Sequence, residues 1–324
     1  MDGLELRPYA GEADVAEITR IDNAELEADA IPGRGNAEGR LAWYRHASEM
    51  FDPARDVTLA FVDGEAVGYA ERKWIDTNDG EYREYRVDGA VHPAWRRRGI
   101  GGALLEHNEA VLRELARGHQ TERKLTFGTW SGETQPARMA LLERHGYGQV
   151  RWFFDMTRPH LDDVPEVPLP AGLELRETTP ELIYQVWHAD IEAFRDHWGG
   201  GDESDEALKR YIENPNHDAS LWLIAWDGDE VAGGTVNGIE REENEALGLR
   251  RGWLQSVFTR RAWRKRGLAS ALIARSLTLL RERGMTSAVL GVDADNPTGA
   301  LGLYERAGFE VSYRSTAWRK PFEV

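Results

Sequence analysis

The alternation of apolar and polar residues predicts an ordered series of strands and helices, most clearly in the second half of the chain. Short apolar runs typical of strands occupy 173–176, 221–226, 230–239, 253–259, 288–292 and 309–317. Helices are expected from Pro180, over 205–213, from Leu268, where apolar residues recur at the spacing of one helical face, and over 298–306. This order predicts an α/β fold with a mixed, mostly antiparallel sheet flanked by helices.

Similar segments recur in the two halves of the chain. Residues 3–7 are repeated unchanged at 172–176, 94–101 recur at 262–269 with three changes, and 143–147 resemble 305–309. Because the matches keep their order while their offsets drift, they indicate two copies of one domain with loops of different length. The proline-containing acidic segment 160–172 has little to pack and predicts a semi-rigid spacer, which places the domains at 1–160 and 171–324.

Composition narrows the classes of protein. The 324 residues are 41% hydrophobic and 30% charged, as in globular proteins, and the absence of cysteine excludes disulfides, thiolate nucleophiles and cysteine-ligated metals. The chain has no apolar run of about 18 residues and an acidic start, so we expect no membrane helix, no secretory signal and a cytoplasmic location. The histidines show no metal-ligand spacing, and no metal is predicted.

The charge balance bears on partners. With 40 Lys and Arg against 56 Asp and Glu, the net charge is −16, which is the wrong sign for a general nucleic-acid binder. An acidic surface favours cationic partners, for instance a polyamine, an aminoglycoside or an amino sugar. We therefore expect a small-molecule partner that carries positive charge, with no nucleic acid and no membrane.

The segment Arg264-Lys265-Arg266-Gly267-Leu268-Ala269 lies between a predicted strand and the long helix. A helix start leaves backbone N–H groups unpaired and carries a partial positive charge, so it attracts phosphate. Small residues at 267 and 269 let a pyrophosphate approach the backbone, and the basic side chains can bond its oxygens. The alternative is a solvated basic loop that only caps a helix.

This segment resembles the Arg/Gln-x-x-Gly-x-Gly/Ala signature of the GNAT superfamily of N-acetyltransferases, in which it holds the pyrophosphate of acetyl-CoA. The order of strands and helices also matches, so the chain resembles two tandem GNAT-like domains, as in the mycothiol synthases. The resemblance implies acetyl-CoA as cosubstrate. The contacts that it implies are Arg264, Lys265, Arg266, Gly267, Leu268, Ala269 and Ser270 in the second copy, and Arg96, Arg97, Arg98, Gly99, Ile100, Gly101 and Gly102 in the first.

Two further positions carry over from the family in the second copy. Asn296 stands where an Asn touches the pantetheine arm, and Tyr304, four residues before Gly308, stands where a Tyr protonates the departing thiolate. A phenol with a pKa near 10 is a competent donor to that sulfur. The alternative for Tyr304 is a core aromatic residue on an amphipathic helix.

The first copy lacks both residues. Aligning Gly146 with Gly308 places Leu142 opposite Tyr304 and Thr134 opposite Asn296. Because leucine cannot donate a proton, we expect the second copy to catalyse and the first to be degenerate, with a cofactor loop that it has kept.

A splayed strand is the third feature that the resemblance implies, because the pantetheine amides pair with its backbone as an added strand would. In the second copy this strand is the run 255–259, with Val257, Phe258 and Thr259 as contacts. In the first copy the matching positions are Gly89 and Val91.

The general base is left open. A protonated amine must lose a proton before it attacks, and GNAT proteins use a carboxylate, a His or water for this. The polar residues near the expected site are Asp190, Glu192, Asp196, His197, Glu240, Glu242, Gln255 and Ser256. Each carboxylate can equally be a solvated surface charge.

The sequence favours an enzyme that moves an acetyl group from acetyl-CoA to a primary amine by direct transfer, since there is no cysteine for an acyl-enzyme route. The alternative from another class is a non-catalytic acyl-CoA-binding or scaffolding protein. Release of the free CoA thiol with a panel of amines separates the two.

Overall fold

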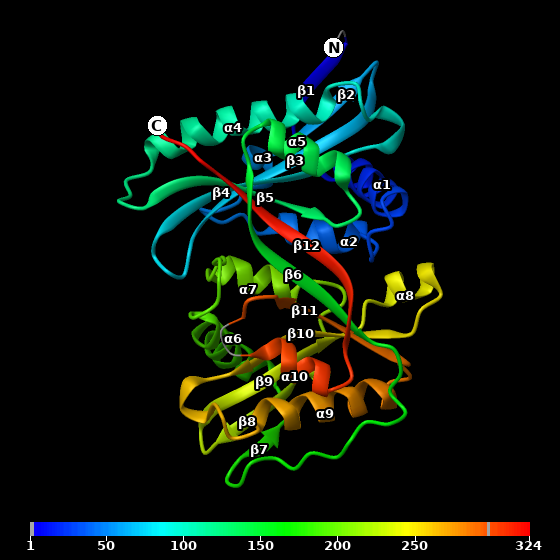
Figure 1. The fold of residues 1–324 in the computed structure, drawn as a ribbon, viewed down its shortest axis with the longest axis vertical. Coiled ribbons are helices and arrows are strands. Elements are labelled where there is room, and N and C mark those ends of the chain that lie inside the picture. The colour runs from blue at the N-terminus through cyan, green and yellow to red at the C-terminus, as the bar shows by residue number, and fades with distance from the viewer. Residues whose placement is uncertain (1–2, 297–298) are drawn as a thin grey trace. The chain divides into compact units, whose positions relative to one another are not determined.

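The computed structural model describes residues 3–296 and 299–324, and the chain forms two compact units (Figure 1). Unit 1 comprises Met1–Trp152, Trp198–Pro215 and Tyr313–Val324, and unit 2 comprises Phe153–His197 and Asn216–Ser312. The units therefore differ from the sequence repeats. A segment of the second repeat, Trp198–Pro215, and most of the last strand of the chain, from Tyr313, belong to unit 1.

The sheet of unit 1 has five strands from the first repeat and one from the second. Their order in the sheet is β1 (Leu4–Pro8), β2 (Val57–Val62), β3 (Glu65–Asp76), β4 (Tyr82–Val91), β5 (Lys124–Gly132) and β12 (Glu310–Pro321). All neighbours are antiparallel except β4 and β5. The helices of this unit are α1 (Glu12–Ala28), α2 (Ala37–Arg45), α3 (Pro53–Asp56), α4 (Ile100–Gly118), α5 (Pro136–Arg144) and α7 (Asp205–Ile212).

The sheet of unit 2 follows the same plan. Its order is β7 (Glu174–Arg176), β8 (Leu223–Asp227), β9 (Glu230–Gly238), β10 (Arg251–Thr259), β11 (Ser287–Asp293) and β6 (Gly148–Arg158), and the sixth strand comes from the first repeat. Only β10 and β11 run parallel. The helices are α6 (Pro180–Phe194), α8 (Arg241–Leu247), α9 (Leu268–Glu282) and α10 (Ala300–Arg306). The expected mixed, mostly antiparallel α/β fold is confirmed in both units.

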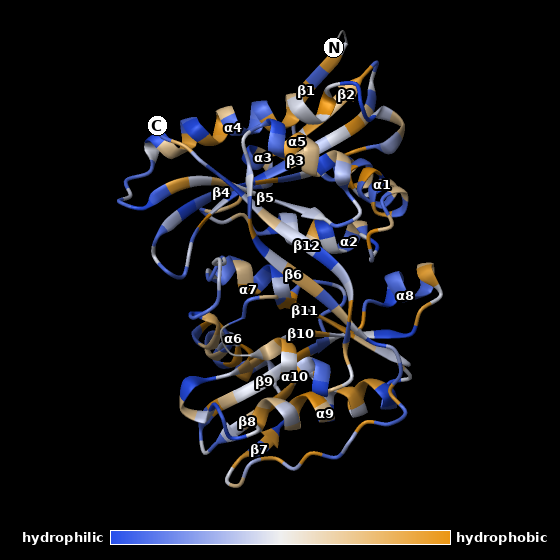
Figure 2. Cartoon of the chain, in the orientation of Figure 1, coloured by the Kyte–Doolittle hydropathy of each residue, from blue (hydrophilic) through white to orange (hydrophobic). Residues whose placement is uncertain are grey.

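Each unit has its own hydrophobic core beside a long helix. Leu104, Leu105 and Leu112 of α4 pack with Phe127 and Trp318 of the sheet in unit 1, while α1 covers a second cluster. In unit 2, Ile273, Leu277 and Leu280 of α9 pack with Leu254 and Leu290. Figure 2 shows hydrophobic and hydrophilic residues interspersed along α4 and α9, as one-sided burial requires. Each fully buried leucine contributes about 1.5–3 kcal/mol.

The last strand is firmly anchored in unit 1. Trp318 is 1% exposed, and its indole N–H donates to Ser131 Oγ at 2.8 Å. Lys320 Nζ lies 2.7 Å from Glu109 Oε2 of α4. From Tyr313 onward, this strand therefore completes the hydrophobic core of a unit that otherwise comes mainly from the first repeat.

The strands and helices expected from the sequence are present in the second repeat, with ends that differ by a few residues, and Thr298 of the expected helix 298–306 lies outside the described residues. The short helix α8 was not expected. The prediction of a spacer with little to pack was wrong at Leu161, which is 2% exposed in the core of unit 2. Its carbonyl also accepts a hydrogen bond from Arg281, so this segment is fixed on unit 2.

Candidate active site

The two predicted phosphate loops have the same backbone conformation. Gly99 and Gly267, which cap α4 and α9, have φ of +87° and +85°, and Arg97 and Lys265 have φ of +64° and +62°. A non-glycine residue with positive φ costs roughly 1–2 kcal/mol, so its presence at the same position in both loops indicates a selected shape. Left-handed residues turn neighbouring N–H groups toward one concave side, where an anion can bind.

The first turns of α4 and α9 are open to a ligand. Neither N-cap side chain accepts a hydrogen bond from its helix, because both caps are glycine. A Cβ placed on Gly99 or Gly267 would meet nothing within 4 Å. Unpaired N–H groups and open space at a helix start are the requirements for a diphosphate.

The first arginine of each loop is held by the protein itself. Arg264 donates to the Thr259 and Ala193 carbonyls and to Asp196 Oδ2, each at 3.0 Å. Hydrogen bonds from Arg261 and Arg264 lower the pKa of Asp196 to about 2. Arg96 binds Asp29 in the same way, at 2.6 Å, and the Val91 carbonyl.

These contacts change the role expected for Arg96 and Arg264. Their guanidinium groups position the loops against the ends of α1 and α6, instead of offering free donors to phosphate. Of the other basic residues, Arg98 donates to the Ala94 carbonyl and Arg266 to the Ala171 carbonyl, both at 3.3 Å. Arg97 and Lys265 are exposed and stay candidates for a phosphate contact.

The expected splayed strands are visible in the register of both sheets. The parallel pairing of β10 with β11 covers only Arg251–Trp253, and that of β4 with β5 covers only Tyr82–Arg86. Among the described residues, the later part of β10 is paired only with β9, and the later part of β4 is paired only with β3. Val257, Thr259, Gly89 and Val91 lie on these open edges. Phe258 is 2% exposed, so its side chain belongs to the core.

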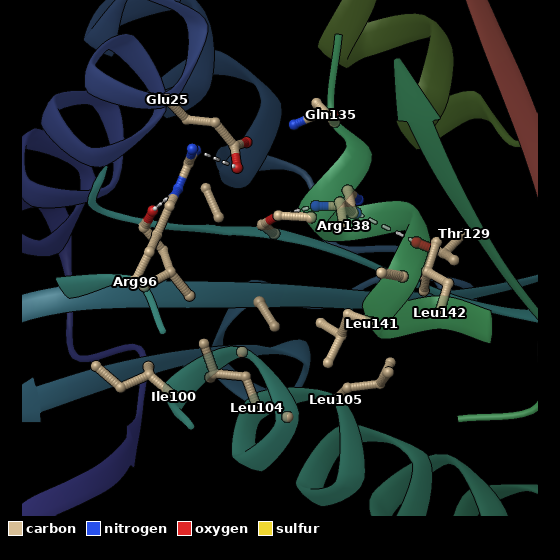
Figure 3. A pocket seen from close by; sticks show the side chains of 18 of the residues that line it. Glu25, Arg96, Ile100, Leu104, Leu105, Thr129, Gln135, Arg138, Leu141 and Leu142 are labelled. Atoms are coloured by element: carbon tan, nitrogen blue, oxygen red, sulfur yellow. Dashed lines mark hydrogen bonds and ion pairs between the residues drawn. The ribbon is translucent and has the colours of Figure 1, made fainter. Parts of the chain in front are cut away.

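Unit 1 contains a cavity of about 550 Å³ at the open edge of β4 (Figure 3). Its apolar wall includes Ile100, Leu104 and Leu105 of α4 and Leu141 and Leu142 of α5. All but one of the site residues predicted in the first copy line it, Arg98 being the exception. They are Gly89, Val91, Arg96, Arg97, Gly99, Ile100, Gly101 and Gly102.

Arg138 crosses this cavity from α5. Its Nη1 donates to the Gly89 carbonyl of β4 at 2.7 Å, and its Nε donates to the Trp130 carbonyl of β5 at 2.6 Å. Both carbonyls lie beyond Arg86 and Gly128, the last pair of the parallel ladder. The guanidinium therefore bridges the two strands at the point where they diverge.

Leu142 and Tyr304 occupy equivalent places, as the alignment of Gly146 with Gly308 predicts. Each lies three residues before the C-cap of its helix, and its carbonyl accepts from the residue five positions later, Tyr147 or Phe309, at 3.0 Å. Tyr304 is 7% exposed, and burial raises its pKa to about 12. Its hydroxyl makes no hydrogen bond to any residue that the structure describes. Because its pKa is raised, the hydroxyl keeps its proton at neutral pH and can donate it.

Asn296 lies at the turn after β11. Its backbone N–H donates to the Asp293 carbonyl at 3.1 Å, and its carbonyl accepts from the Gly299 N–H at 3.2 Å. Residues 297–298, which follow it, lie outside the described residues. The role of Asn296 toward the pantetheine arm stays a prediction.

Most of the polar residues considered as bases are already paired. Glu192 binds Arg260 at 2.8 Å, Asp196 binds two arginines, and Glu240 accepts from Asn216. Asp190 accepts from Ser256 Oγ at 2.5 Å, and burial raises its pKa to about 6.

Sequence reasoning missed Arg138 and Asp29 at the end of α1, and it considered Asp196 at the end of α6 only as a candidate base. The alignment that places Leu142 opposite Tyr304 also places Arg138 opposite Ala300. The sequence therefore already showed that the two copies differ at this position. Asp29 and Asp196 are separated in the sequence by nearly the same number of residues as Arg96 and Arg264. This similarity could have indicated that each aspartate binds the arginine of its own copy. Their contacts, however, depend on tertiary packing.

Two comparisons concern sequence. Residues 183–309 match the family described as "Acetyltransferase (GNAT) family", and 53–149 match "Acetyltransferase (GNAT) domain". Proteins named mycothiol acetyltransferase from Geodermatophilus obscurus and Salinispora arenicola are 31% and 30% identical to this chain. The alignments cover 95% and 92% of the chain and 94% and 95% of those relatives.

Solved structures give the same result. A GCN5-related N-acetyltransferase from Sphaerobacter thermophilus has a TM-score of 0.73 and 29% identity, and covers 99% of this chain and 96% of its own. A tandem GNAT protein from the clavulanic acid biosynthesis pathway has a TM-score of 0.70, 21% identity and 98% coverage of both chains, and shows the likeness of fold. The resemblance inferred from the sequence is confirmed.

No helix in the described ranges is long and apolar enough to cross a membrane. Within the same ranges, no cluster of three or more His, Asp or Glu side chains could hold a metal ion.

Proposed function

Because the chain belongs to the GNAT acetyltransferase family and transfers acetyl groups from acetyl-CoA to an amine, we propose that its second repeat carries the active site and that its acceptor is a small cationic molecule. The assignment of the active site to the second repeat is supported by one observation: Tyr304 in the second repeat occupies the structural position that Leu142 has in the first. Only the second repeat has a proton donor there.

Arg138 supports the same assignment. In the first repeat its guanidinium binds the Gly89 carbonyl, which is one of the backbone groups expected to pair with a pantetheine amide. In the second repeat the matching residue is Ala300, which has no side chain to reach across the sheet. We infer that the first repeat keeps a phosphate loop and a cavity, while Arg138 obstructs the end where a thioester would lie.

The residues of the second repeat fit acetyl-CoA, which supplies the acetyl group as a thioester. The N–H groups that open α9 at 267–270 would hold the diphosphate, and the free edge of β10 at Val257 and Thr259 would pair with the pantetheine amides. Tyr304, which its raised pKa keeps protonated, would donate its proton to the departing sulfur.

The acceptor class rests on two observations. The relatives from Geodermatophilus and Salinispora are named after the small molecule mycothiol, which favours a small-molecule acceptor here. The net charge of −16 favours a cation, because a negative surface potential raises the local concentration of amines. A non-catalytic acyl-CoA-binding protein is the alternative that the experiment must separate.

The experiment combines calorimetric titration of acetyl-CoA with CoA-thiol release in the presence of glucosamine, spermidine or kanamycin. We expect wild type to bind one equivalent and to release thiol with at least one of these amines. Arg138→Ala should bind a second equivalent with unchanged turnover, whereas the reciprocal Ala300→Arg should lower kcat/KM by at least about 100-fold. Binding without thiol release would favour the alternative, and loss of turnover in Arg138→Ala alone would place catalysis in the first repeat.

A further inference from the structure

Asp190 lies beside the strand that the acetyl donor is expected to pair with. It is the eleventh residue of α6, and its Oδ1 accepts a hydrogen bond from Ser256 Oγ of β10 at 2.5 Å. Ser256 directly follows the bulge in the register of β10 with β9, and it precedes Val257 on the open edge. The bulge and the hydrogen bond together bring this carboxylate to the place where β10 leaves β11.

Asp190 has no cation partner within the described part of the chain. The helix α6 packs against β9 and β10. The charged residues of these strands are Glu230, which lies 3.6 Å from Arg260, and Arg251, which binds Glu243. On α6 itself, Glu192 is bound to Arg260, and Glu181 lies in the first turn. Burial raises the pKa of Asp190, and the hydrogen bond from Ser256 opposes this effect.

The first repeat provides an internal comparison. Aligning the N-caps Gly11 and Thr179 places Asp22 opposite Asp190, each as the eleventh residue of its helix. Asp22 is ion-paired with Arg40 and accepts a hydrogen bond from the Tyr69 hydroxyl. The first repeat therefore supplies its own cation to this aspartate, whereas no cation of the second repeat is paired with Asp190 among the residues that the structure describes.

A partly buried carboxylate without a cation lowers the stability of the folded state, so its presence here suggests a role in function. The second oxygen of Asp190, Oδ2, accepts no hydrogen bond from any residue in the described ranges, and the residue keeps some solvent exposure. An ammonium group of an acceptor has the charge and the donors that this oxygen lacks. The position of Arg40 in the first repeat marks where such a cation would lie.

We propose that Asp190 binds the acceptor ammonium and is the general base of the transfer, held in place by Ser256. This rests on the proposed function of the second repeat. Asp190 takes one proton from the ammonium, the neutral nitrogen attacks the thioester carbonyl, the carbon–sulfur bond breaks, and Tyr304 donates its proton to the sulfur. The nitrogen is positively charged after the attack and loses its second proton as the amide forms, and this proton restores Tyr304. Asp190 then releases its proton to solvent, so the products are the amide, the CoA thiol and one proton.

The test uses the full chain with Asp190→Asn, and with Glu192→Gln as the control on the same helix. The probes are glucosamine, spermidine and kanamycin, and thiol release to water alone gives a rate that needs no amine. In wild type, kcat/KM should rise with pH through a limb near pH 6, because Asp190 must be ionised to accept a proton. Asp190→Asn should lower kcat/KM by roughly 100- to 10,000-fold and abolish this limb, with acetyl-CoA affinity unchanged.

A positioning role of Ser256 gives a separate readout. Ser256→Ala removes the hydrogen bond that lowers the pKa of Asp190, so the acidic limb should move to higher pH while the rate at high pH is largely kept. Retention of the limb and of kcat/KM in Asp190→Asn would overturn the proposal, as would an equal loss in Glu192→Gln. Failure of wild type to bind acetyl-CoA would instead contradict the proposed function. Calorimetric titration of acetyl-CoA distinguishes this outcome from a failure of the proposal for Asp190.

Discussion

Replacement of Tyr304 by Phe separates the two interpretations of this residue, proton donor or core aromatic. The ring is 7% exposed and packs edge-on against Phe309, with centroids 6.1 Å apart, so phenylalanine can fill the same space. The hydroxyl has no hydrogen-bond partner among the described residues, and its removal leaves no group there unpaired. We therefore expect the free energy of unfolding to change by less than about 1 kcal/mol at pH 7.

The expected effect on catalysis is much larger. Loss of a positioned general acid costs roughly 100- to 10,000-fold in rate, which corresponds to about 3–5 kcal/mol in the activation free energy. Measured as CoA-thiol release at saturating acetyl-CoA, Tyr304→Phe should lose kcat by that factor with an unchanged dissociation constant for acetyl-CoA. Tyr184→Phe, which changes a tyrosine of α6 that is 55% exposed, is the matched control and should behave as wild type.

The pH dependence of stability gives an independent check. Burial raises the pKa of Tyr304 in the folded protein to about 12, above the ordinary value of 10.0. The folded state thus holds its proton more tightly, so wild type should lose stability progressively from pH 10 to pH 12, by about 3 kcal/mol. Tyr304→Phe should lack this loss. Full turnover in Tyr304→Phe would refute the proton-donor role, and a large drop in stability at pH 7 would indicate a structural role for the hydroxyl.

Two more predictions concern the loops and the last strand. Gly267→Val forces a β-branched residue to a φ of +85° at the start of α9, and we expect the KM for acetyl-CoA to rise at least about tenfold, whereas Gly99→Val in the first loop should leave kcat and KM unchanged. Trp318→Ala should destabilise unit 1 by about 3–5 kcal/mol, which hydrogen exchange would detect in β5 before β9. Equal protection loss in both strands would contradict the assignment of β12 to unit 1.

The repeated loop was predictable because its chemistry depends on contiguous residues. A glycine at a helix start and the basic residues before it specify a local conformation, and the structure shows nearly the same dihedral angles in both copies. The equivalence of Tyr304 and Leu142 was also available from an alignment, since both are fixed by their distance from a helix C-cap. The sequence could not single out the base that we propose, because Asp190 differs from the other candidate carboxylates only in its burial and in the contact with Ser256.

The sequence by itself determined two copies of a mixed α/β domain, the place of the glycine-containing loop at the start of each long helix, and the exchange of Tyr304 for Leu142 between the copies. These properties follow from the spacing and composition of residues within one short segment, so they can be read from the sequence without knowing what the segment contacts. Only the tertiary structure decided that β12 completes the sheet of unit 1, that Arg138 bridges β4 and β5, and that Asp190 has no cation partner among the described residues. Such features depend on residues far apart in the chain, and burial, which sets their energies, exists only once the chain has folded.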